Sequence, residues 1–190
     1  MLLDDRRSLL LLVDPQTRLL GALPPARAKA LLPRWLLLVK AAEILGIPAL
    51  VTRQYPQGLG PLADPLLKAL PPAVVCRDKT TFSCVADPAI ARLFEGERDQ
   101  VVVAGIETHV CVLQTALDLV AQGARPAVVA DACGSRHPES HALALTRLAQ
   151  SGVALLTAES VVFEWMRDAT HPRFRELAPL IKALPAGDPA

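Results

Sequence analysis

Charge of one sign is the first thing that this chain of 190 residues lacks. Lysine and arginine total 20 residues against 19 aspartates and glutamates, which leaves a formal net charge of +1. No stretch gathers the basic residues into a stripe, and proteins that bind nucleic acid or anionic membranes usually present such a patch. We therefore expect no nucleic-acid partner and no membrane partner.

Cysteine is scarce, and long hydrophobic runs are missing. The four cysteines, at positions 76, 84, 111 and 133, form no CxxC pair and no zinc spacing. No run approaches the roughly 20 apolar residues that cross a bilayer. The apolar run after Arg7 stops at Asp14, and no small-residue cleavage site follows it. We expect a cytoplasmic protein with reduced thiols and no secretory signal.

Aromatic side chains are also rare, at 4%, although 52% of the residues are hydrophobic. The apolar character therefore comes from leucine, alanine and valine. Helical faces rich in leucine are natural surfaces for self-association. We expect a homo-oligomer, and the sequence leaves its stoichiometry open.

What the chain does contain is a regular alternation of strand and helix patterns. Short apolar runs predict strands, and apolar residues spaced by three and four predict helices. Strands are expected at 8–13, 48–53, 73–76, 100–105, 126–131 and 153–156, with helices near 33–45, 86–95, 109–122 and 139–150. This alternation predicts an α/β fold, a three-layer sandwich whose mainly parallel six-stranded sheet is flanked by helices. A single domain over 1–190 is expected, with a flexible tail at 184–190.

A cysteine follows one of these strands at a strand-to-helix elbow. The apolar run that begins at Val101 leads into Gly-Ile-Glu-Thr-His-Val-Cys-Val at 105–112. The residues after Cys111 have helical spacing, so this cysteine is predicted in the first turn of a helix. The helix dipole and free N–H groups stabilise an anion there by roughly 0.3–1 kcal/mol, which favours a thiolate. A lone cysteine is more often a small buried hydrophobic residue, so other residues must decide.

Asp14 and Lys79 follow two other strand candidates. Asp14 ends the run that starts at Leu9, and Lys79 follows the run at 73–76. Ligands of open parallel sheets bind outside the carboxyl ends of the strands, so we expect Asp14 and Cys111 in one cleft. A turn-forming aspartate before proline and a solvated surface lysine are the alternatives. Together the three side chains supply a nucleophile, a base and a cation that orients the base.

These three motifs together resemble the isochorismatase-like cysteine hydrolases, a family that includes the nicotinamidases. The family carries an Asp after its first strand, a Lys after its third and a Cys at its fourth strand-to-helix elbow. The resemblance implies an isochorismatase-like, Rossmann-like fold with Asp14, Lys79 and Cys111 as catalytic triad. The segments at 51–60, 130–136 and 171–177 are similar to the subfamily of isochorismatase domain-containing proteins.

The resemblance also implies a mechanism. Asp14, assisted by Lys79, would take the Cys111 proton, and the thiolate would attack a small amide or related acyl substrate to give a thioester-type intermediate. Family members have a cis peptide bond before the elbow, which falls here at Ile106–Glu107. The backbone amides of Glu107 and Cys111 would then form the oxyanion hole. True isochorismatases carry a smaller residue in place of this cysteine, so an amidase-type hydrolase acting on a C–N bond is implied, with its substrate unknown.

Other residues near the three motifs are candidates for substrate binding. Tyr55 and Phe82 follow strand ends and are candidates to line a pocket for a planar substrate, although aromatic residues more often only pack. Thr108 is a candidate for contact with substrate and also a plausible helix N-cap. His109 lies two residues before Cys111, which places the two on different sides of a helix, so it is expected at the rim.

Metal and cofactor sites are not expected. Nicotinamidases carry an Asp and His metal site after the second strand, whereas residues 53–56 here read Arg-Gln-Tyr-Pro. The glycine-rich patterns of nucleotide-binding domains are missing as well. A non-enzymatic alternative stays open, in which the chain is an oligomeric interaction module or a redox-sensing thiol protein with a vestigial site. The complete set of Asp14, Lys79 and Cys111 favours catalysis.

Overall fold

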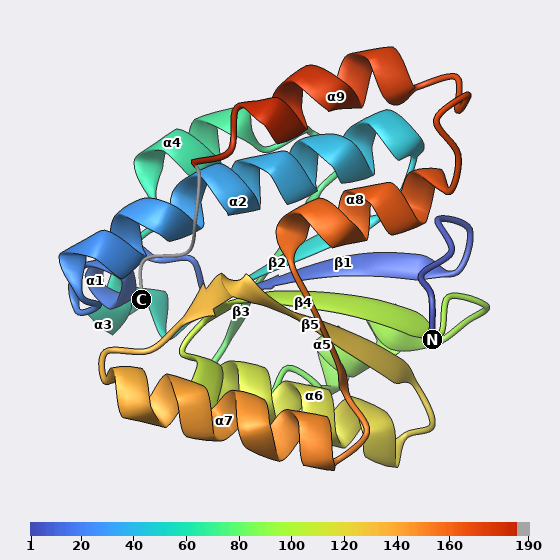
Figure 1. Cartoon of the computed structure of the whole chain (residues 1–190). Coiled ribbons are helices and arrows are strands. Elements are labelled where there is room, and N and C mark those ends of the chain that lie inside the picture. Colours follow the sequence, from blue (N-terminus) through green and yellow to red (C-terminus); the bar gives the residue numbers. More distant parts are fainter. Residues whose placement is uncertain (186–190) are drawn as a thin grey trace.

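The computed structural model describes residues 1–185 and contains one parallel sheet between layers of helices (Figure 1). The six strands are all parallel and pair in the order β3-β2-β1-β4-β5-β6. Their bounds are β1 Ser8–Val13, β2 Ala49–Gln54, β3 Val75–Lys79, β4 Gln100–Ile106, β5 Arg125–Gly134 and β6 Ala154–Leu156. The predicted α/β sandwich with a six-stranded sheet is confirmed, although β3 begins two residues later than expected.

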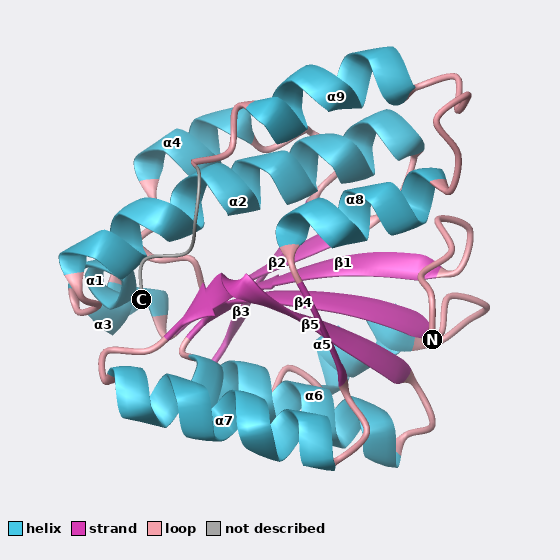
Figure 2. Ribbon diagram, viewed as in Figure 1, coloured by secondary structure: helices cyan, strands magenta, loops and turns pink. Residues whose placement is uncertain are grey.

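The helices form two layers, one on each face of the sheet (Figure 2). One layer consists of α2 Pro25–Leu45, α4 Asp64–Ala69, α8 Ala158–Met166 and α9 Phe174–Lys182. The other consists of α5 Pro88–Ala91, α6 Leu113–Ala121 and α7 Pro138–Gln150, with the short helices η1 Arg92–Phe94 and η2 Thr108–Val112. The remaining short helices, α1 Thr17–Gly21 and α3 Pro56–Leu59, lie at the carboxyl ends of the strands.

Strand β1 shows why the sheet needs both layers. Its six residues are all buried, as a central strand of a parallel sheet must be. Leu10 and Leu12 point into the apolar core beneath α2, while Leu9, Leu11 and Val13 join the core on the α6 face. The apolar run in the sequence is therefore continuous because β1 is buried on both faces of the sheet.

Helix α2 is longer than the predicted helix at 33–45. It begins at Pro25, which occupies the first helical turn, where the missing N–H of proline costs nothing. Pro33 lies inside the helix and does not start it, so this part of the prediction was wrong. The helix ends at Gly46, which adopts the left-handed conformation with φ +68°. The helix predicted at 86–95 is divided into α5 and η1.

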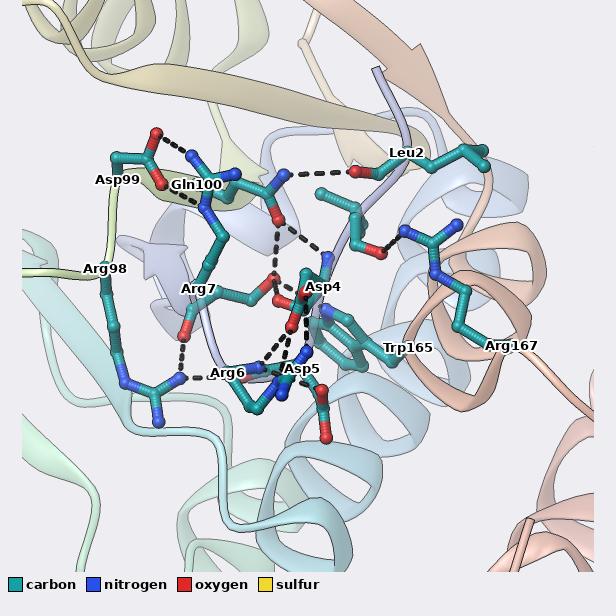
Figure 3. Close-up of polar contacts among 12 residues, drawn as sticks. Leu2, Asp4, Asp5, Arg6, Arg7, Arg98, Asp99, Gln100, Trp165 and Arg167 are labelled. Atoms are coloured by element: carbon teal, nitrogen blue, oxygen red, sulfur yellow. Dashed lines mark hydrogen bonds and ion pairs between the residues drawn. The ribbon is translucent and has the colours of Figure 1, made fainter.

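Polar contacts of the N-terminal segment fix the amino end of β1 (Figure 3). Asp14 follows the other, carboxyl end of this strand. The Asp4 N–H donates to the Gln100 side chain at 2.7 Å, and that side chain donates to the Leu2 carbonyl at 3.0 Å. Arg98 donates to the Asp5 carbonyl at 2.7 Å, and the Arg167 guanidinium donates to the backbone of the same segment. These bonds hold β1 in register with β4.

Two features concern the chain as a whole. Within residues 1–185, no helix has both the length and the apolar character required to cross a membrane. Leu184 packs against the core on the α2 face. The rest of the tail expected at 184–190 lies, from residue 186 onward, outside the described residues.

Candidate active site

The pairing of β1 with β4 brings Asp14 to the cysteine elbow. Val13 pairs with Gly105, so Asp14 directly follows β1 where β4 approaches its end. Gly105 has a φ of +127°, and a Cβ at this position would overlap the Val13 carbonyl. Asp14 itself is held at φ +50°, an uncommon value for a residue with a side chain. The close approach of the two strands therefore requires glycine at 105.

Asp14 forms a fully buried ion pair with Lys79. The Lys79 Nζ lies 2.7 Å from Asp14 Oδ2, and neither side chain is exposed to solvent. The other carboxylate oxygen of Asp14 accepts a hydrogen bond from the Thr52 hydroxyl at 2.7 Å. Two of the three predicted catalytic residues are thus in direct contact, and Thr52 on β2 fixes the orientation of the carboxylate.

The Lys79 ammonium is surrounded by oxygen acceptors. Besides Asp14, it donates to Gln54 Oε1 at 2.6 Å and contacts the carbonyls of Phe82 at 3.1 Å and Thr81 at 3.2 Å. Burial, the largest effect, lowers the pKa of Lys79, but the Asp14 carboxylate and the nearby cysteine sulfurs raise that pKa, and the net shift is upward. Lys79 therefore stays charged inside the site.

Cys111 lies in η2, the first turn of the helical segment that continues as α6, and is 5% exposed. This position confirms the predicted elbow. Burial, the nearby Asp14 carboxylate and a hydrogen bond with it raise the pKa of Cys111 to about 12, although Lys79 acts in the opposite direction. The expectation that the helix start favours a resting thiolate was wrong, because desolvation outweighs the roughly 0.3–1 kcal/mol that a helix dipole supplies.

The backbone before the cysteine turns sharply into the helix. The Ile106–Glu107 peptide bond is cis, as the resemblance implied. Within residues 1–185, the Glu107 N–H donates no hydrogen bond, whereas the Glu107 carbonyl accepts from the N–H groups of Val110 and Val112 at 3.1 and 3.3 Å. The buried Glu107 carboxylate accepts from the Arg136 N–H at 2.9 Å. An unpaired N–H at this place is available to a ligand oxygen.

Thr108 and His109 connect the elbow to the start of α7. Thr108 is fully buried, and its hydroxyl lies 2.8 Å from His141 Nδ1. The predicted N-cap role of Thr108 was wrong, because Glu107 occupies the cap position and has no side-chain cap bond. His109 Nδ1 lies 2.9 Å from the hydroxyl of buried Ser135. Neither bond involves the Cys111 thiol, in line with the rim position expected for His109.

Tyr55 and Phe82 are the exposed aromatic residues at this end of the sheet. Their exposed fractions are 55% and 54%, so both residues keep surface that is available for contact. Their backbones contact Lys79: the Tyr55 N–H donates to the Lys79 carbonyl at 2.9 Å, and the Phe82 carbonyl accepts from the ammonium. Tyr55 has φ +36°, and its ring covers Gly58, where any side chain would clash with it.

Sequence reasoning missed three side chains that complete the site. Thr52 and Gln54 occupy alternate positions at the end of β2 and point to the same face, where they reach Asp14 and Lys79. Their polar character at the end of an apolar strand was the available signal. Cys84 lies with its sulfur 3.9 Å from the Thr52 hydroxyl, and burial raises its pKa to about 11.

The donor groups of a metal site do not converge in the described part of the chain. Among residues 1–185, no group of three or more His, Cys, Asp or Glu side chains is arranged to hold a metal ion.

Comparison with known proteins identifies relatives over most of the chain. The family model described as the isochorismatase domain matches residues 8–160. The mouse isochorismatase domain-containing protein 2A is 42% identical over 148 residues, which cover 76% of this chain and 69% of the mouse protein.

Two solved structures extend this likeness to the fold. A structure described as the MAR1 ribonuclease of Caenorhabditis elegans is 32% identical, with a TM-score of 0.91 over 97% of this chain and 95% of that chain. The YcaC product of Escherichia coli, described as an octameric hydrolase of unknown specificity, is 26% identical. Its TM-score is 0.82 over 97% of this chain and 98% of that chain.

Proposed function

We propose that this chain, which belongs to the isochorismatase family of hydrolases, cleaves a small amide or related acyl substrate with Cys111 as the nucleophile. The proposal assigns Asp14 as the base and Lys79 as the cation that balances charge. It implies an amidase-type reaction at a C–N bond and no cofactor.

The buried Asp14–Lys79 ion pair beside the Cys111 thiol carries this proposal. Moving two charges out of water costs several kcal/mol per ion, so such a pair is a poor way to stabilise a fold. A carboxylate next to a thiol, with a fixed cation behind it, can accept the thiol proton at little cost. The pair therefore fits catalysis better than the scaffold alternative.

The first half of the reaction forms an acyl-enzyme. Because the pKa of Cys111 is about 12, the resting thiol keeps its proton and transfers it to Asp14 as sulfur attacks the carbonyl carbon. The transfer leaves the net charge of the site unchanged, since Lys79 stays cationic. We assign the amides of Glu107 and Cys111 as donors to the developing oxyanion, each worth on the order of 3 kcal/mol. The C–N bond then breaks, and Asp14 gives the proton to the leaving amine.

The second half of the reaction releases the acid. Water attacks the thioester carbonyl and gives a proton to Asp14. The carbon–sulfur bond breaks, the carboxylic acid leaves, and the proton returns from Asp14 to the Cys111 sulfur. Each group ends in its starting state, as a catalyst must.

The walls of the site favour a substrate with a planar or apolar part. Tyr55 and Phe82 offer exposed rings where β2 and β3 end, and we assign these two residues to substrate contact. Thr108 is fully buried and its hydroxyl is bonded to His141, so we assign it to holding the elbow that faces the substrate. Aromatic faces bind flat groups through offset or edge contacts, so aromatic amides belong in the test set beside aliphatic amides.

The test is turnover of a panel of small amides, followed by ammonia or amine release. We expect Cys111→Ala to lose at least about 10³-fold in kcat/KM with its fold retained. Cys76→Ala, which removes an exposed thiol, is the matched control and should keep full activity. RNA forms a separate arm of the panel because one similar structure is described as a ribonuclease. Equal turnover by the native protein and Cys111→Ala would remove the nucleophile assignment, and no turnover at all would favour the redox or scaffold alternative.

We further propose that the chain forms a homo-oligomer. The similar YcaC product is described as octameric. This chain exposes several large apolar side chains, among them Leu143 and Phe163, at 71% and 45%. Light scattering at micromolar concentration should give a mass above that of one chain, and a strict monomer would contradict the proposal.

A further inference from the structure

The Lys79 ammonium has more oxygen acceptors than hydrogens. Three N–H groups face four oxygen atoms at 2.6–3.2 Å, of which the shortest contact is to Gln54 Oε1. The ammonium is therefore fixed by its partners and does not have to donate to the Cys111 sulfur. The Gln54 amide is the one neutral side chain among these four partners, since the others are a carboxylate and two backbone carbonyls.

The orientation of the Gln54 amide is determined by its own bonds. Its Nε2 donates to the Thr80 carbonyl at 2.7 Å, so its Oε1 must face Lys79. The Gln54 backbone is held in turn by buried Gln16, whose side chain accepts from the Gln54 N–H at 2.7 Å. The same side chain donates to the carbonyls of Gln54 and Gly60 at 3.0 and 2.8 Å. Two buried glutamines thus connect the ammonium to the backbone of the loop after β2.

We propose that Gln54 is a positioning residue, which holds the Lys79 ammonium beside Asp14 without adding charge to the site. The inference rests on the proposed function, because it concerns the cation of that mechanism. Gln54 acts through Lys79 and does not touch the reacting atoms. Gln16 supports it by fixing the end of β2.

The charge balance of the site explains why the residue is a glutamine. In the resting state one carboxylate, Asp14, balances one ammonium, Lys79. When the Cys111 proton moves to Asp14, a thiolate takes over the negative charge and the sum is unchanged. A glutamate at 54 would add a second carboxylate at the ammonium, so the thiolate would form against an excess negative charge.

Few other titratable groups act on the Cys111 thiol. Asp14, Lys79 and Cys84 are the groups that shift its pKa. Among the titratable groups of the elbow and of α7, Glu107 faces Arg136, His109 faces Ser135, and His141 faces Thr108 and Arg27. A charge placed at 54 would therefore act mainly through Lys79.

The experiment measures alkylation of Cys111 by iodoacetamide in the folded protein, with the rate for each cysteine read by mass spectrometry at fixed pH between 7 and 9. Well below the thiol pKa, the rate is proportional to the thiolate fraction, so one pKa unit changes it tenfold. We expect Gln54→Glu to slow Cys111 about tenfold or more and Gln54→Met, which removes the acceptor, to slow it at least about threefold. Gln57→Glu makes the same charge change at an exposed position and should stay within twofold of the native rate.

Several outcomes decide the proposal. Native alkylation rates in folded Gln54→Glu and Gln54→Met would overturn it, because a merely structural role lowers stability without changing the thiolate fraction. If Gln54→Glu does not fold, the rate in Gln54→Met decides alone. An equal slowing in Gln57→Glu would also overturn it. Alkylation requires no turnover, so a slowed Cys111 in a protein that hydrolyses no amide would support the positioning role and reject the hydrolase proposal.

Discussion

Among the side chains of the site, the ion pair between Asp14 and Lys79 is the pair whose burial costs the most free energy. Both side chains are fully buried, with 2.7 Å between Oδ2 and Nζ. Removal of one partner leaves the other charge buried and unpaired, which typically costs about 3–5 kcal/mol. We therefore expect Asp14→Asn and Lys79→Met each to lower the free energy of urea unfolding by about that amount. The double variant should recover part of the loss, because no unpaired charge remains.

An exposed pair of the same type is the control. On the surface of α4, Lys68 Nζ lies 2.6 Å from Asp64 Oδ2, and most of both side chains is exposed. Asp64→Asn should change the free energy of unfolding by less than about 1 kcal/mol. If Asp14→Asn proves no more harmful than Asp64→Asn, the two buried groups are not a charged pair in solution, and the mechanism loses its fixed cation.

The ionisation of Cys111 is the second residue-scale prediction. Because burial and Asp14 raise its pKa to about 12, the alkylation rate of Cys111 should increase about tenfold per pH unit from pH 7 to 10, with no plateau. Exposed Cys76 provides the internal standard and should react first at neutral pH. A plateau for Cys111 below pH 9 would restore the resting thiolate that the sequence alone suggests.

The site shows which residue-scale properties are readable from sequence. Asp14, Lys79 and Cys111 each follow a strand candidate, so their approach at one edge follows from parallel topology. The direction of the Cys111 pKa shift depends on burial and on the distance to Asp14, and the sequence contains neither quantity. Gln54 was missed because its role comes from a partner 25 residues away, at Lys79.

At the scale of elements, the junction of β1 and β4 sets the geometry of the site. Gly105 has φ +127°, and a Cβ there would overlap the Val13 carbonyl, one residue before Asp14. Gly105→Ala must therefore force the strands apart, and we expect a loss of about 3 kcal/mol or more in the free energy of urea unfolding. Activity should fall more than stability alone explains, because Asp14 and Cys111 follow the two separated strands.

Gly123 serves as the control position, because a substitution there causes backbone strain without steric overlap. It also has a positive φ, +82°, but no atom lies within 4 Å of a Cβ built on it. Gly123→Ala should cost only the strain of a left-handed alanine, about 1–2 kcal/mol, and leave turnover unchanged. Equal effects of the two substitutions would show that strand separation contributes nothing.

Some helices and strands could be predicted from a strong pattern in the local sequence, and others could not. The buried strands β1 and β4 were predicted because their continuous apolar runs of five and six residues are typical of strands buried on both faces of a parallel sheet. The start of α2 was missed, because the helix begins at Pro25, eight residues before the predicted start near residue 33. The short α3 and α4 fall in a stretch rich in proline and glycine, where local propensity predicts a loop and tertiary contacts decide.

At the scale of the whole molecule, the two ends of the sheet respond differently to pH. The amino end is held by exposed ion pairs such as Arg7–Asp99, which contribute little to stability. The carboxyl end and the core contain three buried thiols, Cys84, Cys111 and Cys133, with pKa values raised to about 11, 12 and 12. These thiols and Lys79, together with the more exposed Cys76, whose pKa burial also raises, link folding to alkaline pH.

The direction of this linkage follows from proton binding. An unfolded thiol ionises near its ordinary pKa of about 8.5, whereas the folded protein keeps the proton until pH 11–12. Between these values the folded state binds more protons, so the free energy of unfolding falls as pH rises, by about 1.4 kcal/mol per pH unit for each thiol. Lys79, whose pKa is also raised, adds to this loss at the alkaline end.

We therefore expect urea unfolding of the reduced protein to show nearly constant stability between pH 7 and 8 and a steep decline above pH 9. Cys133 is fully buried, so Cys133→Ala should reduce the slope of that decline by the contribution of one thiol, about 1.4 kcal/mol per pH unit. Burial also raises the pKa of the more exposed Cys76, so Cys76→Ser should make the decline shallower too, but by less than Cys133→Ala does. A stability that stays flat to pH 11 would mean that the three thiols ionise in the folded protein as they do in water. In that case the carboxylate and the ammonium of the site would not be separated from solvent, and the charge-balanced proton transfer from Cys111 to Asp14 would have no physical basis.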